Sequence, residues 1–66
     1  MNTNKIKFWR MEKQFRQFDI ARALGVSEGY VSKIETDRMK PSKELLTRIA
    51  EILKVDIEEL TGAGGE

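Results

Sequence analysis

The sequence predicts a compact all-α domain of five helices at residues 1–61, followed by a flexible glycine-rich tail at residues 62–66. Sixty-six residues suffice for one small domain. Apolar residues recur at helical spacing in several segments. Ser27 and Ser42 stand where helix starts need hydrogen-bond acceptors, and Gly25 separates two helical patterns.

The first helix is expected from Asn4 to about Gln14. Ile6 and Trp9 share a face that should pack inward, while the aliphatic stem of Lys13 covers the edge of the core. This helix therefore contributes one apolar face to the domain.

The second and third helices meet at a short turn. The second helix carries an apolar face that ends at Leu24, and Gly25 allows the left-handed conformation that closes a helix. The Ser27 hydroxyl then caps the third helix, and loss of such a cap typically costs about 1 kcal/mol. The turn predicts two short helices that pack against each other at an angle.

The third helix has two different faces. One side is apolar, with Tyr30, Val31 and Ile34, and the opposite side carries Gly29, Ser32, Lys33 and Thr36. A helix with a buried stripe and a short, partly cationic outer face suits insertion into a DNA major groove. The two helices thus have the layout of a DNA-binding helix-turn-helix.

The remaining chain predicts a loop and two helices. Pro41 disfavours helical structure at Lys40, and Ser42 can cap the fourth helix, which has the widest apolar stripe. The last, short helix begins at Asp56 and is anchored by Leu60.

Composition argues against an enzyme. The chain has no Cys and no His, and it shows no nucleophile–base pair, phosphate-binding glycine loop or metal-ligand spacing. No cofactor and no metal are therefore expected. There is also no apolar run of membrane-spanning length and no secretion signal, so a cytoplasmic protein is expected.

The charges are divided unevenly along the chain. Residues 1–43 contain ten basic and five acidic residues, whereas residues 44–66 contain two and six. One interpretation is that the first part faces phosphate, and the other is that mixed surface charges merely happen to segregate.

Several short motifs occur in a characteristic order: Gln17, Ala21, Leu24–Ser27, Ser32–Glu35, Lys40–Ser42, Leu46 and Ile49–Ala50. With them the chain resembles, over residues 4–61, the Cro and phage-repressor type of helix-turn-helix regulators, the xenobiotic response element family of bacteria and phages. The resemblance implies a lambda-repressor-like fold. It also implies a sequence-specific transcriptional regulator, a repressor that binds double-stranded DNA through the major groove without a cofactor.

The resemblance also implies which residues contact phosphate: Arg16, Gln17, Ser27, Arg38, Lys40 and Lys43. Gln17 begins the second helix, where its amide and the positive helix end both suit a phosphate, although a merely solvated residue is the alternative. Arg16 stands where relatives carry a small capping residue, so a helix cap is exchanged for a charge.

For base reading, the outward face of the third helix indicates Gly29, Ser32 and Lys33, and the resemblance adds Glu28. Lys33 can donate to guanine O6 or N7, and Glu28 can accept from cytosine N4. Alternatively, Glu28 only interacts with the helix dipole. Gly29 has no side chain to read a base and permits close approach to the groove.

The resemblance further implies a structural ion pair between Arg10 and Glu35, and a homodimer, because one recognition helix reads only a few base pairs. Candidates for the dimer interface are Val55, Ile57 and Leu60, although Val55 and Leu60 can instead belong to the core.

Phe8, Met11 and Phe18 lie away from the predicted apolar faces. They either cover one another as a small satellite cluster or form a docking surface for a protein partner. The second interpretation gives the alternative function, an antitoxin-like or adaptor module that uses the same fold.

Overall fold

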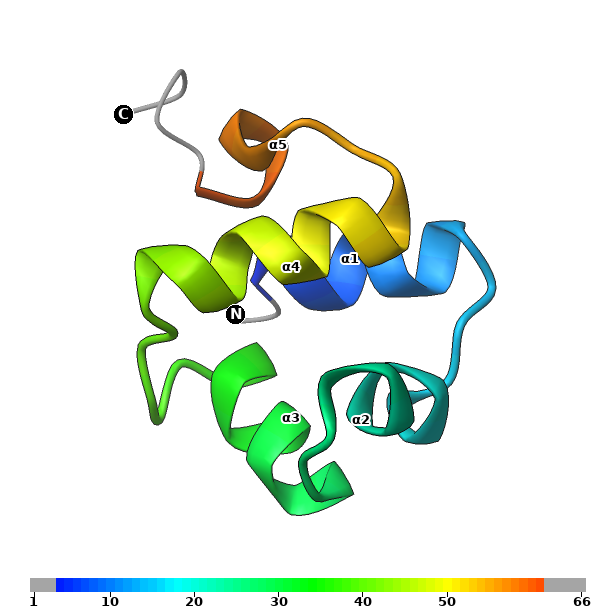
Figure 1. Ribbon diagram of the computed structural model, residues 1–66, viewed down its shortest axis with the longest axis vertical. Helices are drawn as coiled ribbons and strands as arrows, with labels where there is room; N and C mark the ends of the chain where they lie inside the picture. Colours follow the sequence, from blue (N-terminus) through cyan, green and yellow to red (C-terminus); the bar gives the residue numbers. More distant parts are fainter. Residues whose placement is uncertain (1–3, 62–66) are drawn as a thin grey trace.

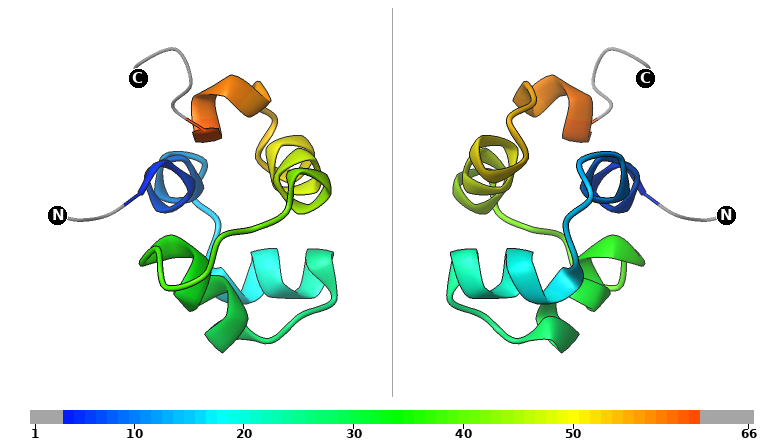
Figure 2. Two further views of the ribbon diagram at one scale, coloured as in Figure 1. Left: turned by 90° about the vertical axis from the view of Figure 1, so that its left-hand side faces the viewer. Right: turned by 90° about the vertical axis from the view of Figure 1, so that its right-hand side faces the viewer.

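The computed structural model describes residues 4–61, so residues 1–3 and the expected tail at residues 62–66 lie outside the described range. The described chain forms α1 (Lys5–Glu12), α2 (Gln17–Leu24), α3 (Glu28–Glu35), α4 (Lys43–Leu53) and α5 (Ile57–Thr61), without a β-strand. Helices α1, α4 and α5 form one side of the molecule, and α2 and α3 form the other (Figures 1 and 2). The all-α fold with its helix-turn-helix is thereby confirmed.

The core lies between these two groups of helices. The apolar faces expected from the sequence supply its buried side chains: Ile6, Ile20, Ala21, Leu24, Val31, Ile34, Ile49, Ala50, Leu53 and Leu60. Burial of one large aliphatic side chain contributes about 1.5–3 kcal/mol. Because the sequence has no cysteine, this packing replaces the disulfides that many small domains need. None of the helices within residues 4–61 has the length and apolar character needed to cross a bilayer.

Helix α1 is shorter than the sequence predicts. Asn4 precedes the helix as its cap, with Oδ1 accepting a hydrogen bond from the Lys7 backbone nitrogen at 3.1 Å. At the other end, Gln14 has φ +64°, in the left-handed region, and cannot continue the helix. The expected end at Gln14 is therefore wrong, because α1 ends at Glu12.

The caps of α3 and α4 are those predicted from the sequence. The backbone nitrogen of Tyr30 donates to Ser27 Oγ at 3.1 Å, and that of Leu45 donates to Ser42 Oγ at 3.1 Å. Each serine thus satisfies one amide that has no partner within the helix. The caps fix where the two helices begin and hence the direction of α3.

Gly25 closes α2 in the left-handed conformation, with φ +76°. Its backbone nitrogen donates to the carbonyl oxygen of Ala21 at 2.8 Å, which satisfies the last turn of the helix. A Cβ atom at this position would have no neighbour within 4 Å, so backbone strain alone requires the glycine. The turn that orients α3 on α2 thus depends on this conformation.

We expect Gly25→Ala to lower the free energy of unfolding by about 1–2 kcal/mol, the cost of a left-handed residue with a side chain. Gly29→Ala is the matched control, because Gly29 lies inside α3 and a Cβ there meets only Ser27 Oγ, at 3.9 Å. This control should raise stability by about 0.5–1 kcal/mol. Urea denaturation of the two variants checks the opposite signs, and equal effects would contradict the assignment.

Candidate nucleic-acid interface

The outer face of α3 carries the four predicted base-reading residues. Glu28, Gly29 and Lys33 are exposed, and Ser32 is half-buried. They are spaced so that they share one side of the helix, opposite Val31 and Ile34 in the core. The structure thus brings a carboxylate, a hydroxyl and an ammonium group together on one face, next to a glycine that has no side chain. These groups can accept hydrogen bonds from base edges or donate to them.

The predicted phosphate-contacting residues flank α3. Helix α2 lies on one side of α3, and the loop leading to α4 lies on the other (Figure 1). The first side contributes Arg16 and Gln17. The second contributes Arg38 and Lys40 from the loop and Lys43 from the start of α4, and all four cations are exposed. A duplex strand runs on either side of a major groove, so cations on both sides of an inserted helix can each meet a phosphate.

The start of α2 has an unusual cap. A guanidinium group has no acceptor, and the Arg16 side chain makes no capping hydrogen bond to the helix. Asp19 acts instead, with Oδ2 accepting from the Arg16 backbone nitrogen at 2.8 Å. Sequence reasoning missed this half of a capping box, although an acidic residue three positions after the cap was its signal. The first-turn amides of α2 therefore have no side-chain acceptor from Arg16, and an anion can supply one.

Ser27 combines two capacities at the start of α3. Its oxygen accepts the capping hydrogen bond from Tyr30, as described above, and the hydroxyl hydrogen can still be donated to another acceptor. The side chain is exposed. Its roles as helix cap and as phosphate donor are thus compatible.

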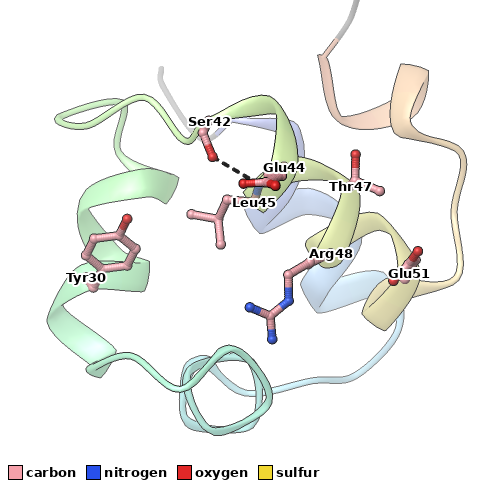
Figure 3. Close-up of a pocket in the computed structure, with 7 residues that line it drawn as sticks. All are labelled: Tyr30, Ser42, Glu44, Leu45, Thr47, Arg48 and Glu51. Carbon is pink, nitrogen blue, oxygen red and sulfur yellow. Dashed lines mark hydrogen bonds between the residues drawn. The ribbon is translucent and has the colours of Figure 1, made fainter.

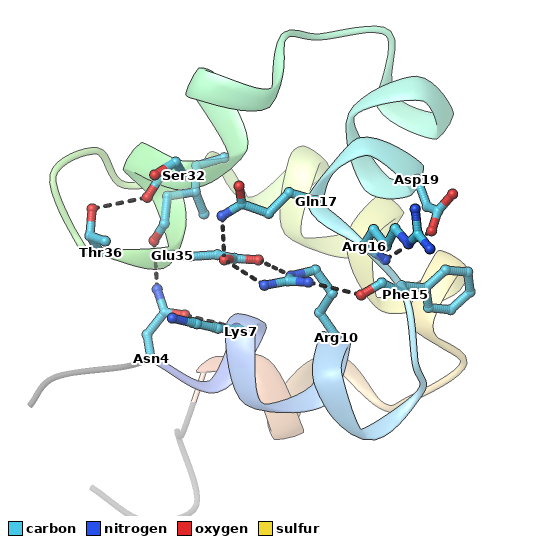
Figure 4. Close-up of polar contacts among 11 residues, drawn as sticks. Asn4, Lys7, Arg10, Phe15, Arg16, Gln17, Asp19, Ser32, Glu35 and Thr36 are labelled. Atoms are coloured by element: carbon cyan, nitrogen blue, oxygen red, sulfur yellow. Dashed lines mark hydrogen bonds and ion pairs between the residues drawn. The ribbon is translucent and has the colours of Figure 1, made fainter.

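The ion pair between Arg10 and Glu35 is present and buried. Arg10 Nε lies 2.6 Å from Glu35 Oε2, and Arg10 Nη2 lies 3.3 Å from Oε1 (Figure 4). Arg10 is 9% exposed and Glu35 is 1% exposed. The remaining guanidinium nitrogen, Nη1, donates to the Phe15 carbonyl oxygen at 2.8 Å. The pair therefore joins α1 to the end of α3 and to the segment that leads into α2.

Gln17 takes part in the same network. Its Nε2 donates to Glu35 Oε1 at 2.9 Å, and the side chain is partly buried. The interpretation of Gln17 as a merely solvated residue is therefore wrong. Sequence reasoning missed this contact, because 18 positions separate the two residues and no local pattern relates them.

Asn4 holds the end of α3 as well as capping α1. Its Nδ2 donates to the Ile34 carbonyl oxygen and, at 3.2 Å, to Asp37 Oδ1 (Figure 4 shows Asn4). Helix α1 thus fixes the carboxyl end of α3 through Asn4 and Arg10. The only sequence signal was an asparagine at a capping position, which predicts a local role but not the distant one.

An open groove lies between α3 and the outer face of α4 (Figure 3). Tyr30 and Leu45 provide apolar surface there, and Arg48 lies between the acidic residues Glu44 and Glu51. Arg48 Nη2 donates to the Ala23 carbonyl oxygen at 3.4 Å, at the end of α2. The two carboxylates would repel a phosphate, so this groove is not part of the candidate interface.

The three unassigned apolar residues remain exposed. Phe8, Met11 and Phe18 remain 51%, 59% and 47% exposed. The Phe8 ring meets the edge of Trp9, with centroids 5.3 Å apart, and the Arg22 guanidinium lies 5.4 Å from the Phe18 ring centroid. Each of the three side chains thus keeps about half of its surface exposed, which is more than a closed satellite cluster would leave.

The proposed dimer residues differ in burial. Of the two alternatives for Leu60, the structure shows the core rather than a surface position, because Leu60 is 7% exposed. Helix α5 as a whole packs against α1 and α4. Val55 and Ile57 pack against the core but are only partly buried, which leaves part of each side chain available at the surface.

Comparisons with known proteins agree with this geometry. The helix-turn-helix family model matches residues 6–60. The chain is 44% identical over 55 residues to the ImmF control region 10 kDa protein of Bacillus phage phi105. The matched segment is 83% of this chain and 61% of that relative. It is also 37% identical over 57 residues to the uncharacterized HTH-type transcriptional regulator MJ0272 of Methanocaldococcus jannaschii, with 86% of each chain covered. The chain belongs to the helix-turn-helix family, in agreement with the predicted Cro and phage-repressor type.

Proposed function

We propose that the protein is a sequence-specific repressor that occupies a two-fold symmetric operator as a homodimer. The main observation in support is the exposed polar face of α3, which is flanked on both sides by exposed cations. A protein that blocks a promoter by occupancy needs only DNA affinity and specificity, and a single domain can supply both. Such a repressor acts in the cytoplasm, and the domain that binds the operator extends over residues 1–61.

The two kinds of contact have different tasks in this proposal. Lys33 and Glu28 contact base edges and select the sequence, with Ser32 beside them and Gly29 allowing close approach. The phosphate contacts set register and affinity: Arg16, Gln17, Ser27, Arg38, Lys40 and Lys43. Glu28 opposes the phosphates electrostatically, so a cytosine amino group is the partner that gives its carboxylate a favourable role.

Selection of bound duplexes from a random DNA library tests the proposal. The salt concentration should be near physiological, because low salt favours binding without sequence preference. We expect enrichment of a symmetric site whose half-sites are about 34–36 Å apart, one helical turn of DNA. Absence of enrichment with folded protein would contradict sequence-specific binding.

The dimer is proposed to form through the exposed parts of Val55 and Ile57. We expect Ile57→Asp to shift the protein toward monomer and to weaken operator binding, because the carboxylate would lose hydration on association. Sedimentation equilibrium at tens of micromolar, with and without the operator, measures both effects. The control is Glu58→Gln, an exposed position on the same helix. An unchanged association state of Ile57→Asp would place the interface elsewhere.

A second candidate function follows from the exposure of Phe8, Met11 and Phe18. We propose that this surface docks a protein partner, as in an antitoxin-like or adaptor module, since half-exposed large apolar side chains are costly to leave in water. Phe8→Ser should then abolish partner binding and leave operator affinity unchanged. Loss of operator affinity in Phe8→Ser would contradict the docking role.

A further inference from the structure

Beneath the candidate interface, the Glu35 carboxylate joins three helices (Figure 4). Its Oε2 accepts from Arg10 Nε at 2.6 Å, while Oε1 accepts from Arg10 Nη2 at 3.3 Å and from Gln17 Nε2 at 2.9 Å. At 1% exposure, Glu35 is shielded from water that could compete for these oxygens. The carboxylate is thus a fixed point to which α1 and α2 are both attached.

This fixed point determines how the Gln17 amide lies. An ionised carboxylate only accepts hydrogen bonds, so it selects the nitrogen end of the amide rather than the oxygen. In Figure 4 the Gln17 oxygen points away from Glu35. The nitrogen carries two hydrogens, and Glu35 takes one of them. The other hydrogen is left for a group outside the network, at the start of α2.

We propose that Glu35 is a positioning residue for DNA binding, which holds the Gln17 amide so that its second Nε2 hydrogen meets a phosphate. The inference rests on the proposed function. The amide nitrogen then lies between two anions and donates one hydrogen to each. Arg10 neutralises the buried carboxylate, so no unpaired charge beneath the interface repels the approaching phosphate.

A double-mutant cycle on operator affinity tests the coupling. Gln17→Met removes the amide while keeping its approximate size, and we expect about a tenfold loss of affinity in the otherwise unchanged chain. The second background carries R10M and E35L, which exchange the buried pair for apolar residues, a replacement that folded proteins tolerate. There the amide is no longer positioned, and Gln17→Met should cost about twofold or less. Gln14→Met, which removes an exposed amide outside the network, is the control and should change little.

Nuclear magnetic resonance of the Gln17 side chain gives a readout that needs only the unsubstituted chain. In the free protein, one Nε2 hydrogen should show the downfield shift and slow exchange of a hydrogen bond to a carboxylate. Addition of the selected duplex should shift the second hydrogen and leave the first unchanged. A first hydrogen that loses its bond when DNA binds would overturn the proposal, even where the R10M and E35L background fails to fold.

The outcomes separate this inference from the proposed function. Equal losses for Gln17→Met in both backgrounds would overturn the positioning role while DNA binding stands. Failure of the unsubstituted chain to bind any selected duplex would overturn the proposed function, and the inference would fall with it. The proposal is supported if the affinity lost on Gln17→Met is larger with the buried Arg10–Glu35 pair than without it. It is further supported if added DNA shifts the second Nε2 hydrogen and leaves the first unchanged.

Discussion

Arg10→Met should lower the free energy of unfolding by about 3–5 kcal/mol, because it leaves a buried carboxylate without its counter-charge. Glu35 is 1% exposed and retains only the Gln17 amide as a side-chain donor once Arg10 is removed. The Phe15 carbonyl oxygen also loses its donor. A domain of this size has a total stability of about 3–10 kcal/mol, so the loss amounts to about a third of that stability or more.

Urea denaturation followed by the fluorescence of Trp9, the chain's one tryptophan, measures this effect. Lys13→Met is the matched control, since it removes an exposed cation next to α1 without a buried partner. The double variant R10M, E35L should recover most of the loss, because no buried charge remains. Equal midpoints for Arg10→Met and the parent would contradict a structural role for the pair. For the folded fraction of Arg10→Met, base preference should not change.

Local signals predicted the elements of this fold well. Gly25, Ser27 and Ser42 act within a few residues of themselves, and each adopts the predicted role. The end of α1 was missed because Gln14 is neither glycine nor proline, so its residue type does not indicate the left-handed conformation that it adopts. Helical spacing also could not tell a core residue from an interface residue, which is why both alternatives stayed open for Leu60 until its burial was known.

The sequence indicated which residues lie on the outer face of α3, but not which hydrogen bonds form beneath that face. The exposed face of α3 follows from periodicity, because the residues opposite Val31 and Ile34 must point outward. The contacts of Gln17 with Glu35 and of Asn4 with Ile34 span 18 and 30 positions. They form only when separate helices come together, so no spacing rule indicates them. The Arg10–Glu35 pair, with a separation of 25 positions, was accessible only through the resemblance to a family.

Lys33→Ala is the second change with a large expected effect, on operator binding rather than on stability. One ammonium-to-guanine contact discriminates by about 1–3 kcal/mol, and a symmetric dimer makes it twice, so the total loss should be about 2–6 kcal/mol. The exposed side chain of Lys33 makes no contribution to the core, and the unfolding midpoint should stay the same. Lys13→Ala is the control for the loss of one positive charge distant from α3.

The pattern of the loss matters more than its size. If Lys33 reads a guanine, Lys33→Ala weakens binding to the selected operator strongly and binding to operators altered at that base pair weakly. If Lys33 only neutralises a phosphate, binding to all operators weakens alike, and the dependence of affinity on salt falls by about one unit of slope per contact. Titrations of the parent and the variant against both duplexes at two salt concentrations separate the cases. A uniform loss would move base selection to Ser32 and Glu28, the other polar side chains on this face of α3.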